Sequence, residues 1–114
     1  LERLLDLMNT QKLFTEPGLD LKSVAQRLDI TPRNLSELVN RELKQGFSNL
    51  LNQYRVEEAK KRIIQMDKRQ KNILMIAFEV GFNSKTSFNT LFKKYAGLTP
   101  SQFYKKHNTF LQET

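Results

Sequence analysis

Two short stretches of this chain each carry charged and hydrogen-bonding side chains at the spacing of a helix. In the first, Arg33, Glu37 and Asn40 recur every three or four residues, with Ser36 beside them. In the second stretch the corresponding side chains are Lys85, Thr86, Asn89 and Thr90. Guanidinium and ammonium groups donate hydrogen bonds, carboxylates accept them, and amides and hydroxyls do both. Each set could therefore read a pattern of donors and acceptors on a polar ligand.

The helix that must position the second set is predicted over residues 85–96. Ser84 is a good N-cap, because its hydroxyl can accept from a free backbone N–H of the next turn. Gly97 suits the left-handed residue that closes a helix. The apolar residues of this segment fall on one stripe, which we expect to be buried: Phe88, Leu91, Phe92 and Tyr95.

The first set is predicted to lie on the second helix of a helix-turn-helix pair. Asp20 can cap a helix that buries Val24 and Ala25, and Thr31-Pro32 reads as N-cap and first residue of the next helix. Only Asp29 and Ile30 lie between the two helices, so they must cross steeply. The second of them buries Leu35, Leu38, Val39 and Leu43, and we expect it to end at Gly46.

The remaining patterns complete an all-α fold of seven helices, with two helix-turn-helix units joined by a long linker helix. Leu1, Leu4, Leu5 and Met8 predict a first helix that Pro17-Gly18 breaks, and residues 47–66 predict a helix of about 30 Å. Asn72 can cap a fifth helix that Gly81 stops. Thr99, Pro100 and Gln102 start a last helix, in which Phe103, Tyr104 and Phe110 are expected to pack. The predicted division is 1–46, 47–71 and 72–114.

An internal repeat supports the two units. Val24-Ala25-x-x-Leu28-x-Ile30 matches Ile76-Ala77-x-x-Val80-Gly81-Phe82, at an offset of 52 residues. The offset becomes 53 in the following helices, so the second turn holds one more residue. The apolar skeleton repeats while the polar residues differ. Two readers of different sequence would give this pattern, and so would a pseudo-symmetric bundle without a ligand.

Composition excludes several other functions. The 114 residues include no Cys and a single His, so neither a disulfide framework nor a metal centre is expected. The sequence has no apolar run of about 18 residues, so no membrane span is predicted. Glu57 and Glu58 are adjacent, so they diverge around a helix and cannot act as an acid–base pair. We therefore expect no cofactor, no membrane contact by this segment and no enzymatic activity.

The net charge of +7 is confined to one half of the chain. Residues 1–54 carry seven basic and seven acidic side chains, whereas residues 55–114 carry twelve basic and five acidic ones. A basic half indicates a polyanionic partner, and a polar helix face with an apolar back fits a DNA major groove. Two such helices must enter grooves about 34 Å apart, which a linker helix of about 30 Å could span. The alternative is a helical protein-interaction module whose basic surface meets an acidic partner.

The whole chain resembles the DNA-binding domain of the AraC/XylS family of bacterial transcription regulators. The resemblance is closest in Ile76-Ala-x-x-Val-Gly-Phe82 and in Ser87-Phe-x-x-x-Phe-Lys93-Lys-x-x-Gly97-x-Thr99-Pro-x-x-Phe-Tyr104. It implies that the third and sixth helices lie in the major groove of double-stranded DNA. The base-facing candidates are Arg33, Ser36, Glu37, Asn40, Lys85, Thr86, Asn89 and Thr90, and the phosphate-contacting candidates are Asn34, Lys44, Ser84, Lys93 and Lys94.

Two residues of the first set have two readings. Arg33 could donate to a guanine edge and Glu37 could accept from cytosine, or the two could form a surface ion pair at i, i+4. The resemblance also implies a sensing or dimerisation domain before Leu1, with a receiver or a membrane-anchored sensor as the alternatives. RNA polymerase is a candidate partner, and a cytoplasmic, nucleoid-associated location is expected.

The charge asymmetry makes a prediction about salt. Because Lys and Arg at phosphates release counterions, log affinity for DNA should fall with log salt, by a slope of about 0.9 for each phosphate neutralised. Neutralising substitutions within 55–114 should flatten this slope more than an equal number within 1–54, measured by fluorescence anisotropy on one duplex. Equal flattening from the two halves would contradict the prediction.

Overall fold

The computed structural model describes residues 1–112, with side chains described as far as residue 107. Within that range the prediction of an all-α fold with seven helices is confirmed. A single 3-10 turn, η1, accompanies the helices. The elements in chain order are α1 (Glu2–Asn9), η1 (Leu13–Thr15), α2 (Leu21–Arg27), α3 (Pro32–Leu43), α4 (Phe47–Ile64), α5 (Ile73–Glu79), α6 (Lys85–Ala96) and α7 (Pro100–Gln112).

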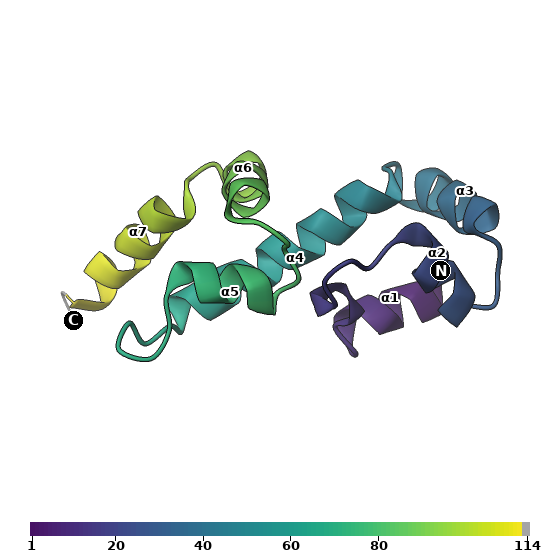
Figure 1. Ribbon diagram of the computed structural model, residues 1–114. Coiled ribbons are helices and arrows are strands. Elements are labelled where there is room, and N and C mark those ends of the chain that lie inside the picture. Colours follow the sequence, from purple (N-terminus) through teal and green to yellow (C-terminus); the bar gives the residue numbers. More distant parts are fainter. Residues whose placement is uncertain (113–114) are drawn as a thin grey trace.

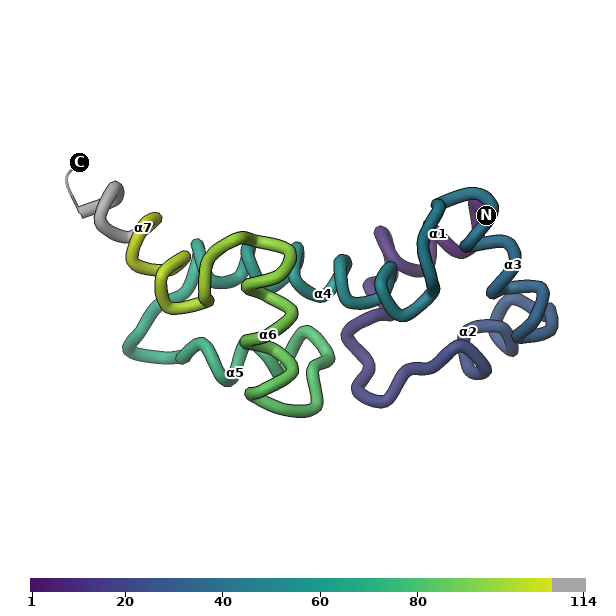
Figure 2. Tube along the Cα trace, turned by 90° about the horizontal axis from the view of Figure 1, so that it is seen from above, coloured from purple at the N-terminus to yellow at the C-terminus, as the bar shows by residue number. Residues whose placement is uncertain are grey.

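The molecule is elongated, with principal extents of 50 × 26 × 25 Å. Helix α4 runs lengthwise through it, with α2 and α3 at one end and α5 and α6 at the other (Figure 2). Helices α3 and α6 both lie along the same long edge of the molecule, at the top of Figure 1. None of the helices in the described range is long and apolar enough to cross a bilayer.

The predicted helix starts are confirmed by their hydrogen bonds. The Asp20 carboxylate accepts from the Ser23 N–H at 2.8 Å, and the Asn72 side chain accepts from the Met75 N–H at 2.9 Å. Thr99 and Gln102 form the predicted reciprocal pair at 3.0 and 3.1 Å. These bonds satisfy backbone N–H groups that have no partner within the helix.

The repeat seen in the sequence is also a repeat of backbone geometry. The N–H of Ile30 donates to the Ala25 carbonyl at 3.1 Å, and the N–H of Phe82 donates to the Ala77 carbonyl at 3.0 Å. Before each donor stands a left-handed residue, Asp29 with φ 57° and Gly81 with φ 110°. The same turn therefore sets the crossing of α2 with α3 and of α5 with α6.

Two predicted helix ends in the first unit are wrong. The first helix ends at Asn9, well before Pro17, because the chain turns into η1 through Lys12 at φ 51°. The third helix ends at Leu43, because Lys44 adopts the left-handed conformation. Gly46, with φ −76°, is the N-cap of α4.

The long helix has 18 residues and ends at Ile64, two residues earlier than predicted. The N–H of Met66 donates to the Ile63 carbonyl, so the last turn tightens into an i, i+3 bond. At 1.5 Å per residue the helix spans about 27 Å.

In the first helix Leu4 and Met8 are buried as predicted, whereas Leu1 is exposed. The predicted packing of Phe110 lies outside the described side chains.

Two hydrophobic clusters form the interior, and α4 contributes to both. Leu50 and Leu51 belong to the cluster that holds α1 to α3, whereas Val56, Ala59 and Ile63 belong to the cluster that holds α5 to α7. The second cluster contains the chain of aromatic contacts from Phe82 through Phe88 and Phe92 to Phe103, with centroids 5.3 to 5.5 Å apart. Helix α4 is thus part of the hydrophobic core of both units.

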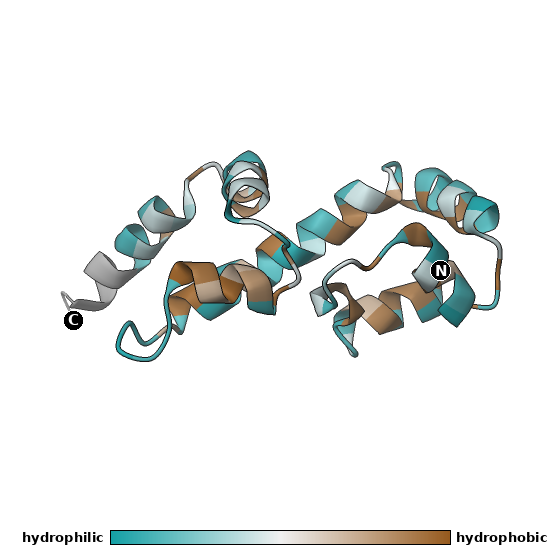
Figure 3. Ribbon diagram, viewed as in Figure 1, coloured by the Kyte–Doolittle hydropathy of each residue, from teal (hydrophilic) through white to brown (hydrophobic). Residues whose placement is uncertain are grey.

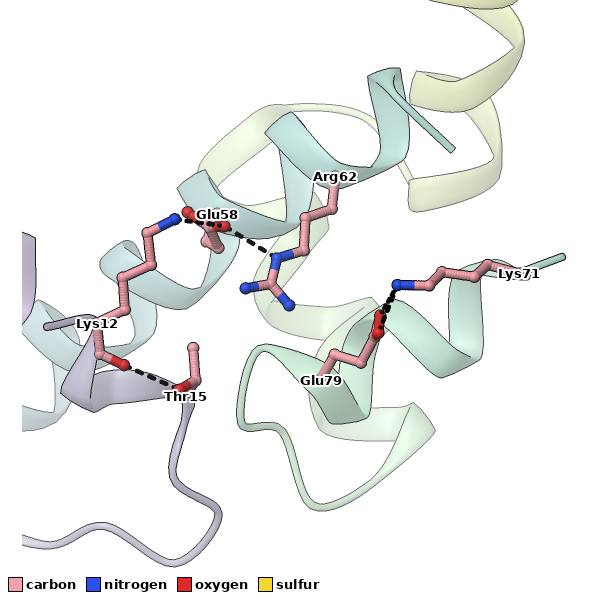
Figure 4. A network of polar contacts seen from close by, with 6 residues as sticks. All are labelled: Lys12, Thr15, Glu58, Arg62, Lys71 and Glu79. Carbon is pink, nitrogen blue, oxygen red and sulfur yellow. Dashed lines mark hydrogen bonds and ion pairs between the residues drawn. The ribbon is translucent and has the colours of Figure 1, made fainter. Parts of the chain in front are cut away.

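Where the clusters meet, buried charged residues of α4 hold the segment around η1. Arg55 donates to the carbonyls of Phe14 at 2.8 Å and Glu16 at 3.0 Å. One turn further along, the Glu58 carboxylate accepts from Lys12 at 3.3 Å and from Arg62 at 2.9 Å (Figure 4). Burial alone would raise the pKa of Glu58, but the hydrogen bonds from Arg62 and Lys12 outweigh it, so the pKa lies below its ordinary value.

This depressed pKa predicts acid sensitivity. The ionised Glu58 stabilises the fold above its unfolded-state pKa, and the contribution is lost as the pH falls through the folded-state pKa. Glu58→Gln should lower the free energy of unfolding by about 1–3 kcal/mol at pH 7, and by less near pH 3, measured by urea denaturation. The control is Glu57→Gln, whose exposed pair with Lys60 should contribute less than about 0.5 kcal/mol. A Glu58→Gln effect that is the same at both pH values would contradict the prediction.

Candidate nucleic-acid interface

The polar face of α3 is presented to solvent. Arg33, Glu37 and Asn40 are exposed and Ser36 is half-buried, while Leu35 and Val39 on the opposite face are fully buried. The Thr31 hydroxyl accepts from the Asn34 N–H at 3.1 Å, so the helix begins where the sequence predicts. Packing of the apolar face against α2 and α4 therefore fixes which side chains point outward.

Side chains on this face are partly paired with one another. Arg33 Nε lies 3.2 Å from Glu37 Oε1, and the two side chains remain 87% and 60% exposed. Such an exposed i, i+4 pair contributes only about 0.3–0.5 kcal/mol, so binding to a ligand can readily replace it. The Asn40 amide donates to the Ser36 carbonyl at 2.9 Å, which leaves its side-chain oxygen as a free acceptor.

The polar face of α6 is open to ligands. Lys85, Thr86, Asn89 and Thr90 are all exposed, and within residues 1–107 none of these side chains has a protein hydrogen bond or an ion pair. Phe88 and Phe92 are buried on the other side of the helix. The structure therefore brings the four predicted side chains together on one accessible surface.

The candidates for phosphate contact lie around these two faces. Lys93 and Lys94 are exposed in the last turns of α6, and Lys94 Nζ lies 5.4 Å from the centroid of the Tyr95 ring. Ser84 accepts from the Ser87 N–H at 3.1 Å, and its hydroxyl hydrogen remains available to donate. Lys44 ends α3, and Asn34 is exposed in its first turn.

The two faces differ in electrostatics. Helix α6 carries three lysines and no acidic residue, whereas α3 carries two arginines and two glutamates. The charge of α6 is therefore net positive, which favours any polyanion regardless of its sequence. The face of α3 is close to neutral, so it must rely on the match of individual donors and acceptors.

The arrangement of the two helices suits a long and regular ligand. Both lie on one edge of the 50 Å molecule, and a connecting helix of about 27 Å is shared by their two units. The ribbon of both helices is largely hydrophilic on its outward side (Figure 3). Successive major grooves of B-DNA on one face are about 34 Å apart, and the connecting helix has a length of the same scale.

Sequence reasoning missed the close approach of Gly81 to Arg55, at the joint between the two clusters. The repeat holds a signal for Gly81, because the equivalent residue of the first unit is Asp29. When one copy of a turn has a side chain and the other copy has glycine, another part of the chain is expected to lie close to the glycine backbone.

Comparisons with known proteins agree with this geometry. A family model described as a helix-turn-helix domain matches residues 24–106. The relatives include the "Uncharacterized transcriptional regulatory protein YesN" of Bacillus subtilis, 37% identical over 79% of this chain and 24% of that protein. The arabinose operon regulatory protein of Escherichia coli is 28% identical over 79% of this chain and 30% of its own length.

Two solved structures have the same fold. The C-terminal domain of AraT, a response regulator from Geobacillus stearothermophilus, superposes with a TM-score of 0.81 and 32% identity, over 92% of this chain and 83% of that domain. The C-terminal domain of the two-component response regulator yesN from Fusobacterium nucleatum gives 0.78 and 27%, over 90% and 95%. The chain belongs to the AraC/XylS family of helix-turn-helix transcription-regulator domains. It spans about a quarter to a third of the curated relatives just described.

The left-handed backbone of Lys44 gives a prediction that separates conformation from charge. A residue with a side chain loses about 1–2 kcal/mol in this conformation and glycine does not. Lys44→Gly should therefore raise the free energy of unfolding by about 1 kcal/mol, while the salt slope of DNA binding falls by about 0.9 if Lys44 contacts a phosphate. Lys44→Ala should change the salt slope equally without stabilising the chain. An unchanged salt slope in both variants would show that Lys44 does not contact a DNA phosphate.

Proposed function

We propose that this domain binds double-stranded DNA at specific sequences to regulate transcription, with α3 and α6 entering successive major grooves. The observation that carries the proposal is the duplicated helix-turn-helix unit built on one shared helix, with both recognition helices on the same edge. A protein-interaction module with a basic surface would require neither the repeat nor this alignment.

The two exposed faces would divide the reading of bases. Arg33 would donate two hydrogen bonds to a guanine edge, and Glu37 would accept from the amino group of cytosine. On α6, Asn89 matches an adenine edge, and the methyl groups of Thr86 and Thr90 can pack on thymine. Ser36, Asn40 and Lys85 complete the base-facing set from the borders of the two faces.

Phosphate contacts would supply most of the affinity. Lys93, Lys94 and Ser84 flank α6, and Asn34 and Lys44 flank α3. Because α6 carries the net positive charge, we assign it the larger share of sequence-independent affinity. We assign α3 the larger share of discrimination, since its neutral face gains little from phosphates alone.

The regulated process would depend on parts of the protein outside this domain. Two of the similar solved structures are C-terminal domains of response regulators. We propose an upstream sensing or dimerisation domain, RNA polymerase as a partner on the DNA, and action in the bacterial cytoplasm. In this scheme the domain supplies DNA binding and no catalytic step.

Selection of bound duplexes from a random pool tests the proposal. The expected result is a motif with two halves centred about 10 base pairs apart, one for each recognition helix. A pool that yields no enriched sequence, together with binding to acidic proteins, would favour the interaction module instead. A motif with one half would contradict the assignment of two recognition helices.

Arg33→Ala tests direct readout within the selected motif. The variant should lose about 1–3 kcal/mol of binding free energy on the selected duplex and accept other base pairs at one position. The control is Arg27→Ala, which removes an exposed arginine of α2 that pairs with Glu16. The control should change affinity equally for all sequences or leave it unchanged. An Arg33→Ala loss that is uniform across sequences would reduce Arg33 to a phosphate contact.

A further inference from the structure

Arg55 lies at the joint between the two helix-turn-helix units. Its side chain is buried, with the residue 8% exposed, in the part of α4 where the first hydrophobic cluster gives way to the second. Its Nε and Nη2 donate to the carbonyls of Phe14 and Glu16, at 2.8 and 3.0 Å. Both carbonyls belong to the segment around η1, whose Phe14 is part of the first cluster.

The second unit also packs against this guanidinium. The carbon at the centre of the group lies 5.9 Å from the centroid of the Phe82 ring. A Cβ placed on Gly81 would lie 2.5 Å from the Phe14 carbonyl oxygen and 2.7 Å from Arg55 Nε. The turn between α5 and α6 therefore touches the first unit directly, and only glycine allows that approach.

Packing alone does not explain why a charged side chain stands at position 55. Burial lowers the pKa of Arg55, because the charged form loses hydration. Buried ions can often be replaced by packed apolar groups without loss of stability. A guanidinium, however, adds direction: its planar fork donates to a pair of carbonyls in a fixed orientation, which an apolar side chain cannot enforce.

We propose that Arg55 is a positioning residue that locks the two units in one relative orientation and so sets the spacing at which α3 and α6 meet DNA. The proposal rests on the proposed function, DNA binding through both units. In a locked molecule, binding of one recognition helix presents the other at its groove. A looser joint would lower the effective concentration of the second helix and widen the range of spacings accepted.

The test compares spacing profiles on the duplex selected by the unmodified chain, with zero, one or two base pairs inserted between its halves. The unmodified chain should lose about tenfold or more in affinity for one inserted pair, as for a mismatched contact. Arg55→Met should bind the original duplex about tenfold more weakly and should lose no more than about threefold on insertion. The control, Lys61→Met, removes an exposed charge from the same helix and should keep the original profile.

The outcomes separate the two claims. If the unmodified chain shows no dependence on spacing, the proposed function fails. If that dependence exists and a folded Arg55→Met keeps it unchanged, the positioning role is overturned. Arg55→Lys keeps the charge but cannot supply the planar fork, so an intermediate profile is expected from it. A profile for Arg55→Lys identical to that of the unmodified chain would also overturn the role.

A measurement without DNA gives an independent readout. Residual dipolar couplings of backbone amides report the orientation of each helix in the free chain. In the unmodified chain, helices α2 and α3 should fit the same alignment tensor as α5 and α6. In Arg55→Met the two pairs should require different tensors, while each pair still fits well internally. One common tensor with unchanged relative orientation in Arg55→Met would overturn the proposal.

Discussion

The contact between a buried guanidinium and two backbone carbonyls sits at the centre of this molecule. Arg55 reaches from the shared helix to Phe14 and Glu16, and the turn at Gly81 closes against the same place. Each unit has its own hydrophobic cluster, so neither needs this contact to bury its apolar residues. The orientation of one unit relative to the other is set by the shared helix α4 and, in our proposal, by how the two units meet at Arg55. The distance and direction between the two recognition helices follow from that orientation.

The two helix-turn-helix units share their turn geometry and differ in their outward side chains. The turn geometry repeats through the bonds from Ile30 to Ala25 and from Phe82 to Ala77, because the crossing of two short helices allows few solutions. The outward side chains take no part in that geometry, so the two faces can carry different chemistry. One face is strongly basic and the other nearly neutral. The same scaffold can therefore supply affinity at one end and discrimination at the other.

Much of this architecture could be predicted from sequence because it is local. The caps at Asp20, Asn72 and Ser84, the apolar stripes and the repeat all involve residues within a few positions of each other, and the polar faces follow from them. The joint could not be predicted in the same way. Arg55 and Glu58 look like surface charges of a long helix. The partners that bury them, Phe14 for Arg55 and Lys12 for Glu58, lie 41 and 46 residues away along the chain. Helix α4 buries different sides at its two ends, so its sequence shows no single apolar stripe along the whole helix. The division into 1–46, 47–71 and 72–114 and the roles of the base-facing residues stay predictions.

We propose that the two recognition helices occupy neighbouring major grooves on one side of the double helix. Hydroxyl-radical footprinting of this domain on its selected duplex reports contact along the backbone at single-nucleotide resolution. Two protected patches are expected on the same face of the duplex, centred about 10 base pairs apart. A single protected patch, or two patches on opposite faces of the duplex, would contradict the proposal.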